Sequence, residues 1–125
     1  TVSVLATFKG KDEESVEALI KFGEILRAES PDLLMVQGDT VTVAISALIA
    51  FYEKINVGHV EAGLRTYNLK SPFPEEGNRQ LVSRLAKYNW APTELAAEQL
   101  QKESVDCLLA KVDATAEDML AGFSL

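Results

Sequence analysis

The chain has 125 residues, of which 47% are hydrophobic and 25% charged. These fractions are typical of folded globular domains, and the length fits one domain, residues 1–125. Nineteen acidic and 12 basic residues give a formal net charge of −7, which disfavours nucleic acid and anionic membranes as partners. One cysteine and one histidine exclude an intrachain disulfide and the usual zinc sites, and fit a reducing, cytoplasmic setting. No apolar segment approaches the ~20 residues of a bilayer span.

Strand-like and helix-like segments alternate from the start of the chain. Residues 1–8 predict a strand, and Asp12 is a candidate N-cap for a helix over residues 13–29. Residues 32–36 form a short apolar run typical of a covered strand, and residues 40–54 predict an apolar helix. The apolar positions expected to share one face of the first helix are Val16, Leu19, Ile20, Gly23 and Leu26.

The alternation continues through the second half of the chain. Residues 56–61 predict a strand, residues 63–73 an irregular stretch, and Pro74 the first position of a helix. The buried stripe expected on that helix is Leu81, Val82, Leu85 and Ala86. The remaining predicted elements are a strand at 88–92, a helix at 93–103 capped by Thr93, a strand at 106–112 and a helix at 114–122.

Five alternations of strand and helix favour a parallel sheet with right-handed crossovers. The expected fold class is therefore α/β, a three-layer Rossmann-like sheet with helices on both faces. In such sheets ligands bind beyond the carboxyl ends of the strands, near helix N-termini. No Gly-x-Gly-x-x-Gly fingerprint and no Gly-Lys-Ser/Thr loop occurs in the sequence, so the common dinucleotide and triphosphate sites are not indicated.

Asp39 lies in a Gly-Asp-Thr turn between a predicted strand and a predicted helix. Glycine allows close backbone approach there, and a carboxylate at this position can bind a substrate or accept a proton. Aspartate is also a preferred N-cap, so capping of the following helix is an equal alternative.

Glu61 ends the predicted strand at 56–61, and alternation places it on one face with Val57 and His59. A carboxylate at the end of a covered strand is poorly explained by packing, which favours a functional role. Arg65 is its expected partner, and a purely structural Glu61–Arg65 ion pair is the alternative. We expect His59 to be a buried, hydrogen-bonded histidine rather than a proton shuttle.

Glu75 and Arg79 lie in the first two turns of the helix predicted from Pro74. The helix dipole favours glutamate in a first turn, and Glu75 and Arg79 have the spacing of an i,i+4 ion pair, so a helical explanation is strong. Two prolines stiffen the approach to the helix, which favours instead a fixed direction of Glu75 into a cleft.

Four stretches of the sequence carry a resemblance to a known family. They are PD and VQGDT at 31–32 and 36–40, VGHVEAGLRT at 57–66, SPFPEEGNR at 71–79, and PTE at 92–94. In order and spacing they resemble the non-hydrolysing UDP-N-acetylglucosamine 2-epimerases, and the middle two motifs are highly specific. The resemblance covers residues 31–94, about half of the chain.

The resemblance implies an isomerase that interconverts UDP-GlcNAc and UDP-ManNAc. In this family UDP is eliminated to leave a glycal and is then added back, with the proton delivered to the other face of C2. The implied fold is of the glycosyltransferase-B type, in which a UDP-sugar lies between two Rossmann-like domains. By resemblance, Asp39, Glu61 and Glu75 are the active-site carboxylates, and Arg79 and Arg65 contact the substrate. We expect no cofactor and no metal.

The resemblance also has departures. The chain matches the later part of the N-terminal domain, without the family's first strand, its Gly-Thr-Arg-Pro-Glu loop or the second, UDP-binding domain. Gln37 stands where many members have histidine, and Ala91 where serine is usual. We therefore expect a fragment that is inactive alone and forms a homodimer through an uncovered sheet edge. The alternative is a freestanding α/β module that binds a nucleotide-sugar or a partner chain without catalysis.

Overall fold

The fold was examined in a computed structural model that describes residues 4–5 and 16–110. The candidate N-cap Asp12 and the helix predicted at 114–122 lie outside these residues. The described strands form one parallel sheet in the order β1-β2-β3-β4-β5. The strands are β1 (Val4–Leu5), β2 (Leu33–Gln37), β3 (Asn56–Val60), β4 (Tyr88–Ala91) and β5 (Leu108–Leu109). The helices are α1 (Val16–Glu29), α2 (Val41–Tyr52), α3 (Glu75–Leu85) and α4 (Glu94–Lys102).

Side-chain caps define the starts of two helices. The Thr40 hydroxyl accepts a hydrogen bond from the backbone N–H of Val43 at the start of α2. The Thr93 hydroxyl does the same for Ala96 in α4, as the sequence predicts. Pro74 occupies the N-cap position of α3 rather than its first turn, so that helix begins at Glu75, one residue later than expected. Strands β2 and β4 therefore each lead through a short turn into a helix whose N-terminus lies near the sheet's carboxyl edge.

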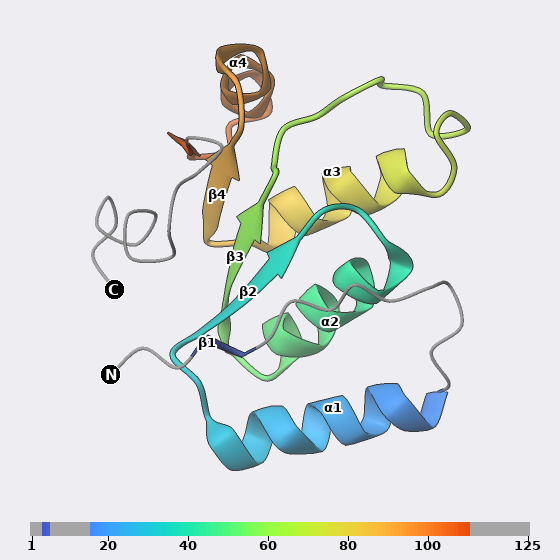
Figure 1. Cartoon of the computed structure of the whole chain (residues 1–125), viewed down its shortest axis with the longest axis vertical. Helices are drawn as coiled ribbons and strands as arrows, with labels where there is room; N and C mark the ends of the chain where they lie inside the picture. The colour runs from blue at the N-terminus through green and yellow to red at the C-terminus, as the bar shows by residue number, and fades with distance from the viewer. Residues whose placement is uncertain (1–3, 6–15, 111–125) are drawn as a thin grey trace.

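Helices α1, α2 and α3 lie on the same side of the sheet (Figure 1). Their inner surfaces form one core with the strand residues that point toward them: Phe22, Leu26, Leu34, Val36, Val43, Ala44, Ala47, Ala50, Val57 and Val82. Consecutive parallel strands joined by crossovers of the same hand bring successive helices to one face. Among residues 4–5 and 16–110, the second helix layer of the expected three-layer arrangement is not present; the opposite face carries the buried cluster Leu33, Met35, Tyr88 and Trp90.

Two helical faces differ from those predicted by periodicity. Phe22 and Leu26 of α1 are buried, whereas Ile20 is 58% exposed because it lies about 200° around the helix from Phe22. In α3 the buried residues include Val82 and Ser83, and Leu81 is exposed. None of the helices in the described residues combines the length and the hydropathy needed to cross a membrane.

Candidate active site

The turn after β2 is held by two hydrogen bonds from β3. The Gly38 N–H donates to the carbonyl of Val60 (3.2 Å), and the Gly38 carbonyl lies 2.8 Å from His59 Nε2. Gly38 has φ +88°, a conformation that L side chains rarely adopt, so glycine is required at this turn. Asp39 follows directly, so these hydrogen bonds to β3 also fix the position of the Asp39 backbone. Capping of α2 by Asp39 is wrong, because Thr40 is the cap.

Two residues of α3 bind Asp39. Arg79 donates to Asp39 Oδ2 from both Nε (2.9 Å) and Nη2 (2.7 Å), and the Asn78 side-chain amide donates to the Asp39 carbonyl (2.9 Å). The arginine side chain is 16% exposed and the aspartate 30%, so the pair lies at the surface of the site rather than in the core. The alternative of an i,i+4 pair between Glu75 and Arg79 is wrong: Arg79 pairs with Asp39 and approaches Glu76 at 3.6 Å.

Glu61 lies directly beyond the carboxyl end of β3. Its φ of 63° departs from strand geometry, so strand alternation no longer fixes its direction. Its Oε1 accepts a hydrogen bond from Gln37 Nε2 (2.7 Å), and its Oε2 lies 3.9 Å from the point that a Cβ on Gly38 would occupy. A left-handed glutamate costs free energy that the surrounding contacts must offset, and such strain is common at functional sites. Glu61 and Asp39 therefore flank the same glycine.

The expected Glu61–Arg65 ion pair is wrong. The Arg65 side chain is fully buried and binds Glu103 through Nε (2.8 Å) and Nη2 (3.0 Å). These hydrogen bonds lower the pKa of the Glu103 carboxyl below its usual value, against the opposing effect of burial. The Tyr67 hydroxyl also lies 2.9 Å from Glu103, and burial together with this neighbour raises the tyrosine pKa. The group fastens the irregular stretch after β3 to the end of α4, so the geometry favours a structural role for Arg65, and its contact with substrate stays a prediction.

Two adjacent glutamates in the first turn of α3 have different environments. Glu76 is completely buried and accepts hydrogen bonds from the backbone N–H groups of Thr66 (3.0 Å) and Tyr67 (2.9 Å) and from Gln80 Nε2 (2.9 Å). Burial raises its pKa, but these donors outweigh burial, and the pKa lies below the ordinary value. Glu75 is partly exposed, and its side chain has no hydrogen-bond or ion-pair partner among the described residues.

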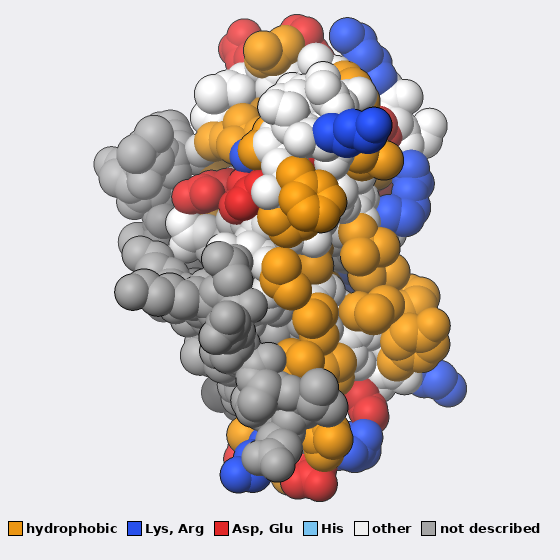
Figure 2. All heavy atoms as spheres, turned by 90° about the vertical axis from the view of Figure 1, so that its right-hand side faces the viewer, with side chains coloured by type: hydrophobic (Ala, Val, Ile, Leu, Met, Phe, Trp, Pro, Cys, Tyr) orange, Lys and Arg blue, Asp and Glu red, His pale blue; other side chains and the backbone are white. Residues whose placement is uncertain are grey.

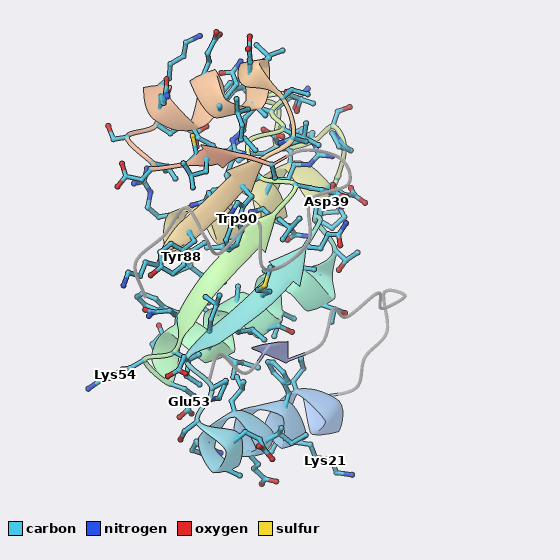
Figure 3. The ribbon with its side chains drawn as sticks, turned by 60° about the vertical axis from the view of Figure 1, so that its left-hand side comes forward. Lys21, Asp39, Glu53, Lys54, Tyr88 and Trp90 are labelled. Atoms are coloured by element: carbon cyan, nitrogen blue, oxygen red, sulfur yellow. The ribbon has the colours of Figure 1, made fainter. Side chains whose placement is uncertain are left out.

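Glu75 shares a helix face with the residues that bind Asp39. Asn78 and Arg79 follow it by three and four residues, which on an α-helix places all three side chains on one side. Figure 3 shows Asp39 at the end of β2, on the opposite edge of the sheet from Glu53 and Lys54. The structure thus places Asp39 directly after Gly38 and Glu61 beside the same glycine, and it places Glu75 one turn before the arginine that binds Asp39.

His59 is fully buried, as expected. Burial lowers its pKa to about 4; the hydrogen bond to Gly38, with Asp39 and Glu61, acts in the opposite direction, and Arg65 adds to the decrease. The ring is therefore neutral at pH 7, and Nε2 must carry the proton because a carbonyl oxygen can only accept. The interpretation of His59 as a structural histidine is confirmed.

Three contacts of this site are not predicted by the sequence. Gln37, which stands where many members of the resembled family have histidine, is the hydrogen-bond donor to Glu61. Asn78 holds the backbone of Asp39, and Glu76 holds the stretch after β3. The one available signal was a polar side chain ending the otherwise buried strand β2.

A parallel sheet with two carboxylates, an arginine and a helix N-terminus at its carboxyl edge defines a Rossmann-like ligand-binding domain. A sequence profile described as UDP-N-acetylglucosamine 2-epimerase matches residues 6–113. The chain belongs to the UDP-N-acetylglucosamine 2-epimerase family.

Individual relatives agree with this assignment. The UDP-N-acetylglucosamine 2-epimerase of Neisseria meningitidis is 42% identical over 104 residues, which is 83% of this chain and 28% of the relative. That of Salmonella borreze is 53% identical over 87 residues, 70% of this chain and 23% of the relative. The chain therefore spans about a quarter of the length of the relatives it matches.

Solved structures show the same fold. The Neisseria meningitidis UDP-GlcNAc 2-epimerase, bound to UDP-GlcNAc, has a TM-score of 0.72 and 41% identity over 81% of this chain and 29% of that one. The Methanocaldococcus jannaschii enzyme, in complex with UDP-GlcNAc and UDP, has a TM-score of 0.68 and 42% identity over 73% of this chain and 25% of that one. The expected fold of this family is confirmed.

Proposed function

We propose that this chain supplies the carboxylate side of an active site that interconverts UDP-GlcNAc and UDP-ManNAc. The observation that carries the proposal is the convergence of Asp39 and Glu61 on Gly38, with Glu75 on the α3 face whose Arg79 binds Asp39. Relatives at 42% and 53% identity bear the name of this epimerase, and a related structure holds UDP-GlcNAc.

The proposed chemistry needs groups that take a proton from C2 of the sugar on one face and return it on the other. Carboxylates at two adjacent strand ends provide such groups at fixed positions. Glu75 differs from its two partners because its side chain has no hydrogen-bond or ion-pair partner among the described residues, so it is the most available of the three carboxylates to a ligand. Elimination of UDP then leaves a glycal, and re-addition completes the inversion at C2.

We assign Arg79 to substrate binding and to the positioning of Asp39. Both of its N–H contacts go to a single oxygen of Asp39, Oδ2, which leaves the other oxygen of that carboxylate available to substrate. A guanidinium held in this way also provides positive charge beside an anionic substrate without an ordering cost at the moment of binding. Arg65, whose guanidinium is buried against Glu103, is proposed to support the site by holding the stretch after β3 against the end of α4.

The experiment that tests the proposed function restores the rest of the enzyme. The 104 matching residues of the Neisseria meningitidis relative are replaced by those of this chain, and deuterium incorporation at C2 of UDP-GlcNAc is followed in D₂O. Asp39→Asn, Glu61→Gln and Glu75→Gln are each expected to slow incorporation by about 10²–10⁴-fold. Asp32→Asn is the matched control, because Asp32 is exposed at the amino end of the same strand that leads to Asp39.

Each outcome of this experiment has a definite meaning. A chimera that folds and binds UDP but exchanges no deuterium removes the enzymatic assignment and favours a non-catalytic binding module. If the carboxylate variants exchange deuterium as fast as the control, the chimera is an epimerase but these three residues are not its catalytic groups. For the chain alone we expect no turnover, and micromolar UDP-GlcNAc binding by calorimetry would contradict the expectation that it binds weakly.

A homodimer is the second part of the proposal. In place of the uncovered sheet edge expected from the sequence, we propose the outer surface of α2 and α3 as the contact. Large apolar side chains lie exposed here, in the column of hydrophobic side chains visible in Figure 2. Leu69 lies over Gly77 near the start of α3, and Phe51 and Tyr52 line a hollow of about 560 Å³ beside Leu85 at its end. Exposed apolar side chains gathered on one surface are typical of subunit interfaces, and a second copy offers the same surface in return.

Sedimentation velocity tests the dimer. Tyr52→Glu, at a side chain 75% exposed, is expected to convert a dimer to a monomer, whereas Lys21→Glu on the exposed surface of α1 leaves it unchanged. A wild-type chain that sediments as a monomer at all concentrations contradicts the proposal.

The composition supports a cytoplasmic setting, because a chain with one cysteine needs no oxidising compartment. Fractionation of the source cells tests this setting.

A further inference from the structure

Three buried polar atoms lie on neighbouring elements of the fold, one each on β3, β4 and α3. They are His59 Nδ1, Asn89 Oδ1 and Ser83 Oγ, and none has a hydrogen-bond partner among the described residues. His59 and Asn89 are directly paired across β3 and β4, so their side chains point to the same face of the sheet. The Asn89 side-chain amide donates to the Ser83 carbonyl (3.3 Å), which brings the serine to the same place.

The protonation of these three atoms follows from their neighbours. His59 Nε2 donates to the Gly38 carbonyl, so the neutral ring presents a lone pair at Nδ1. Asn89 Nδ2 faces the carbonyls of Ser83 and Ala86, so Oδ1, an acceptor, is the atom left over. The Ser83 hydroxyl can donate one hydrogen. The cluster therefore holds two acceptors and one donor, each almost or fully removed from solvent.

One water molecule within reach of all three atoms would satisfy this set. It would donate one hydrogen to His59 Nδ1 and the other to Asn89 Oδ1, and it would accept the hydrogen of the Ser83 hydroxyl. Buried waters in proteins typically make about three hydrogen bonds to polar groups of this kind. Leaving the three atoms without partners is the costly alternative, since a buried polar group without a hydrogen bond destabilises the fold.

We infer that His59, Ser83 and Asn89 bind one internal water molecule, and that this water locks the histidine tautomer which holds the Gly38–Asp39 turn. The water donates a hydrogen bond to Nδ1, so this nitrogen stays unprotonated. The ring proton therefore remains on Nε2 and keeps its hydrogen bond to the Gly38 carbonyl. Gly38 also donates to Val60, so β3 holds this glycine through both its N–H and its carbonyl. His59 is then a positioning residue: it holds Gly38, and Gly38 places Asp39.

This inference depends on the proposed function only for the catalytic role of Asp39, and its tests use no substrate. His59 is the only histidine in the sequence, so ¹⁵N-labelled histidine gives one unambiguous pair of ring signals. At pH 7 we expect the Nε2–H tautomer, together with water cross-peaks of a long-lived internal molecule at the His59 ring and the Asn89 side-chain amide. A Nδ1–H tautomer, or no such cross-peaks in the folded wild-type chain, overturns the inference.

Two substitutions of His59 separate positioning from mere filling of the core. In His59→Gln the side-chain amide can still donate to the Gly38 carbonyl, whereas His59→Phe keeps the ring volume and removes the donor. We expect amide exchange of Gly38 to accelerate about tenfold in the phenylalanine variant and to stay near the wild-type rate in the glutamine variant. The Arg79 Nε–H signal reports the hydrogen bond to Asp39. It is expected to broaden in the phenylalanine variant and to persist in the glutamine variant. Equal behaviour of both variants rules out the positioning role; if neither folds, the wild-type spectra alone decide.

Discussion

Glu75 and Glu76 are adjacent, but replacing them by glutamine has different expected effects: one substitution lowers stability and the other lowers activity. Glu76 is fully buried and accepts two backbone N–H groups and one side-chain amide, whereas Glu75 has no partner among the described residues. Glutamine at position 76 keeps one acceptor oxygen but turns an NH₂ group toward one of these donors. We therefore expect Glu76→Gln to destabilise the chain and Glu75→Gln to leave its stability unchanged.

The size of the effect follows from the hydrogen bonds lost. A hydrogen bond to a charged acceptor contributes about 1.5–3 kcal/mol, and a buried donor without a partner adds a desolvation cost. Glu76→Gln loses at least one such bond, so its unfolding free energy falls by about 3 kcal/mol. With a urea m-value of about 2 kcal/mol/M, the midpoint shifts by about 1.5 M.

Urea unfolding of the wild-type chain and of both variants, followed by circular dichroism at pH 7, measures this difference. Glu75→Gln is expected within about 0.5 kcal/mol of the wild type. Midpoints of the two variants that agree within error would refute the reasoning, because the two substitutions differ only in the environment that each glutamate occupies. In the chimeric enzyme the order reverses: Glu75→Gln is the variant expected to lose exchange at C2 in the folded state.

Further expected outcomes concern pH, two glycines and one ion pair. Between pH 7.5 and 5 the wild-type chain is expected to lose about 2 kcal/mol of stability. In the unfolded chain His59 takes up a proton near its ordinary pKa of 6.5, whereas in the folded chain burial lowers its pKa to about 4. A folded His59→Gln variant that loses as much stability between pH 7.5 and 5 contradicts this assignment. Gly63→Ala is expected to cost more than about 2 kcal/mol in thermal unfolding, because φ is +92° and a Cβ would lie 2.4 Å from the Ala96 carbonyl oxygen. Gly77→Ala, inside α3 where a Cβ would make only an ordinary van der Waals contact with Leu69 (4.0 Å), is expected to stabilise by up to about 1 kcal/mol, and the opposite ranking of the two glycines would refute the geometry. Arg65→Lys is expected to lower the melting temperature by several degrees because lysine cannot make the two-pronged contact with Glu103, and an unchanged transition would show that the contact contributes little.

The order of elements could be predicted from the sequence because each is recorded locally. The apolar run of β2 and the capping threonines Thr40 and Thr93 lie within a few residues of the structure that they specify. The helix predicted over 40–54 is found at Val41–Tyr52 for the same reason. The predicted strand at 106–112 is seen only as Leu108–Leu109 within the described residues, and the strand at 1–8 only as Val4–Leu5.

The partners of the charged side chains could not be predicted in this way. Arg65 binds Glu103, which is 38 residues away, and Arg79 binds Asp39, which is 40 residues away. Nearby carboxylates, Glu61 and Glu75, looked equally suitable from the sequence. Which of two adjacent glutamates points inward depends on a rotation of about 100° per residue around α3, and only the packing of that helix on the sheet sets it. The motifs identified the residues of the site, and the fold determined which of them face each other.

The first turns of α3 have a consequence for how this edge of the protein forms. The irregular stretch between β3 and α3 takes its path from the Glu76 carboxylate, and Asp39 is bound by Asn78 and Arg79 of the same helix. Two separate loops thus take their positions from contacts with a single helix. A substitution that loosens the seating of α3 anywhere along its length should therefore disturb all three carboxylates at once, even where it touches none of them.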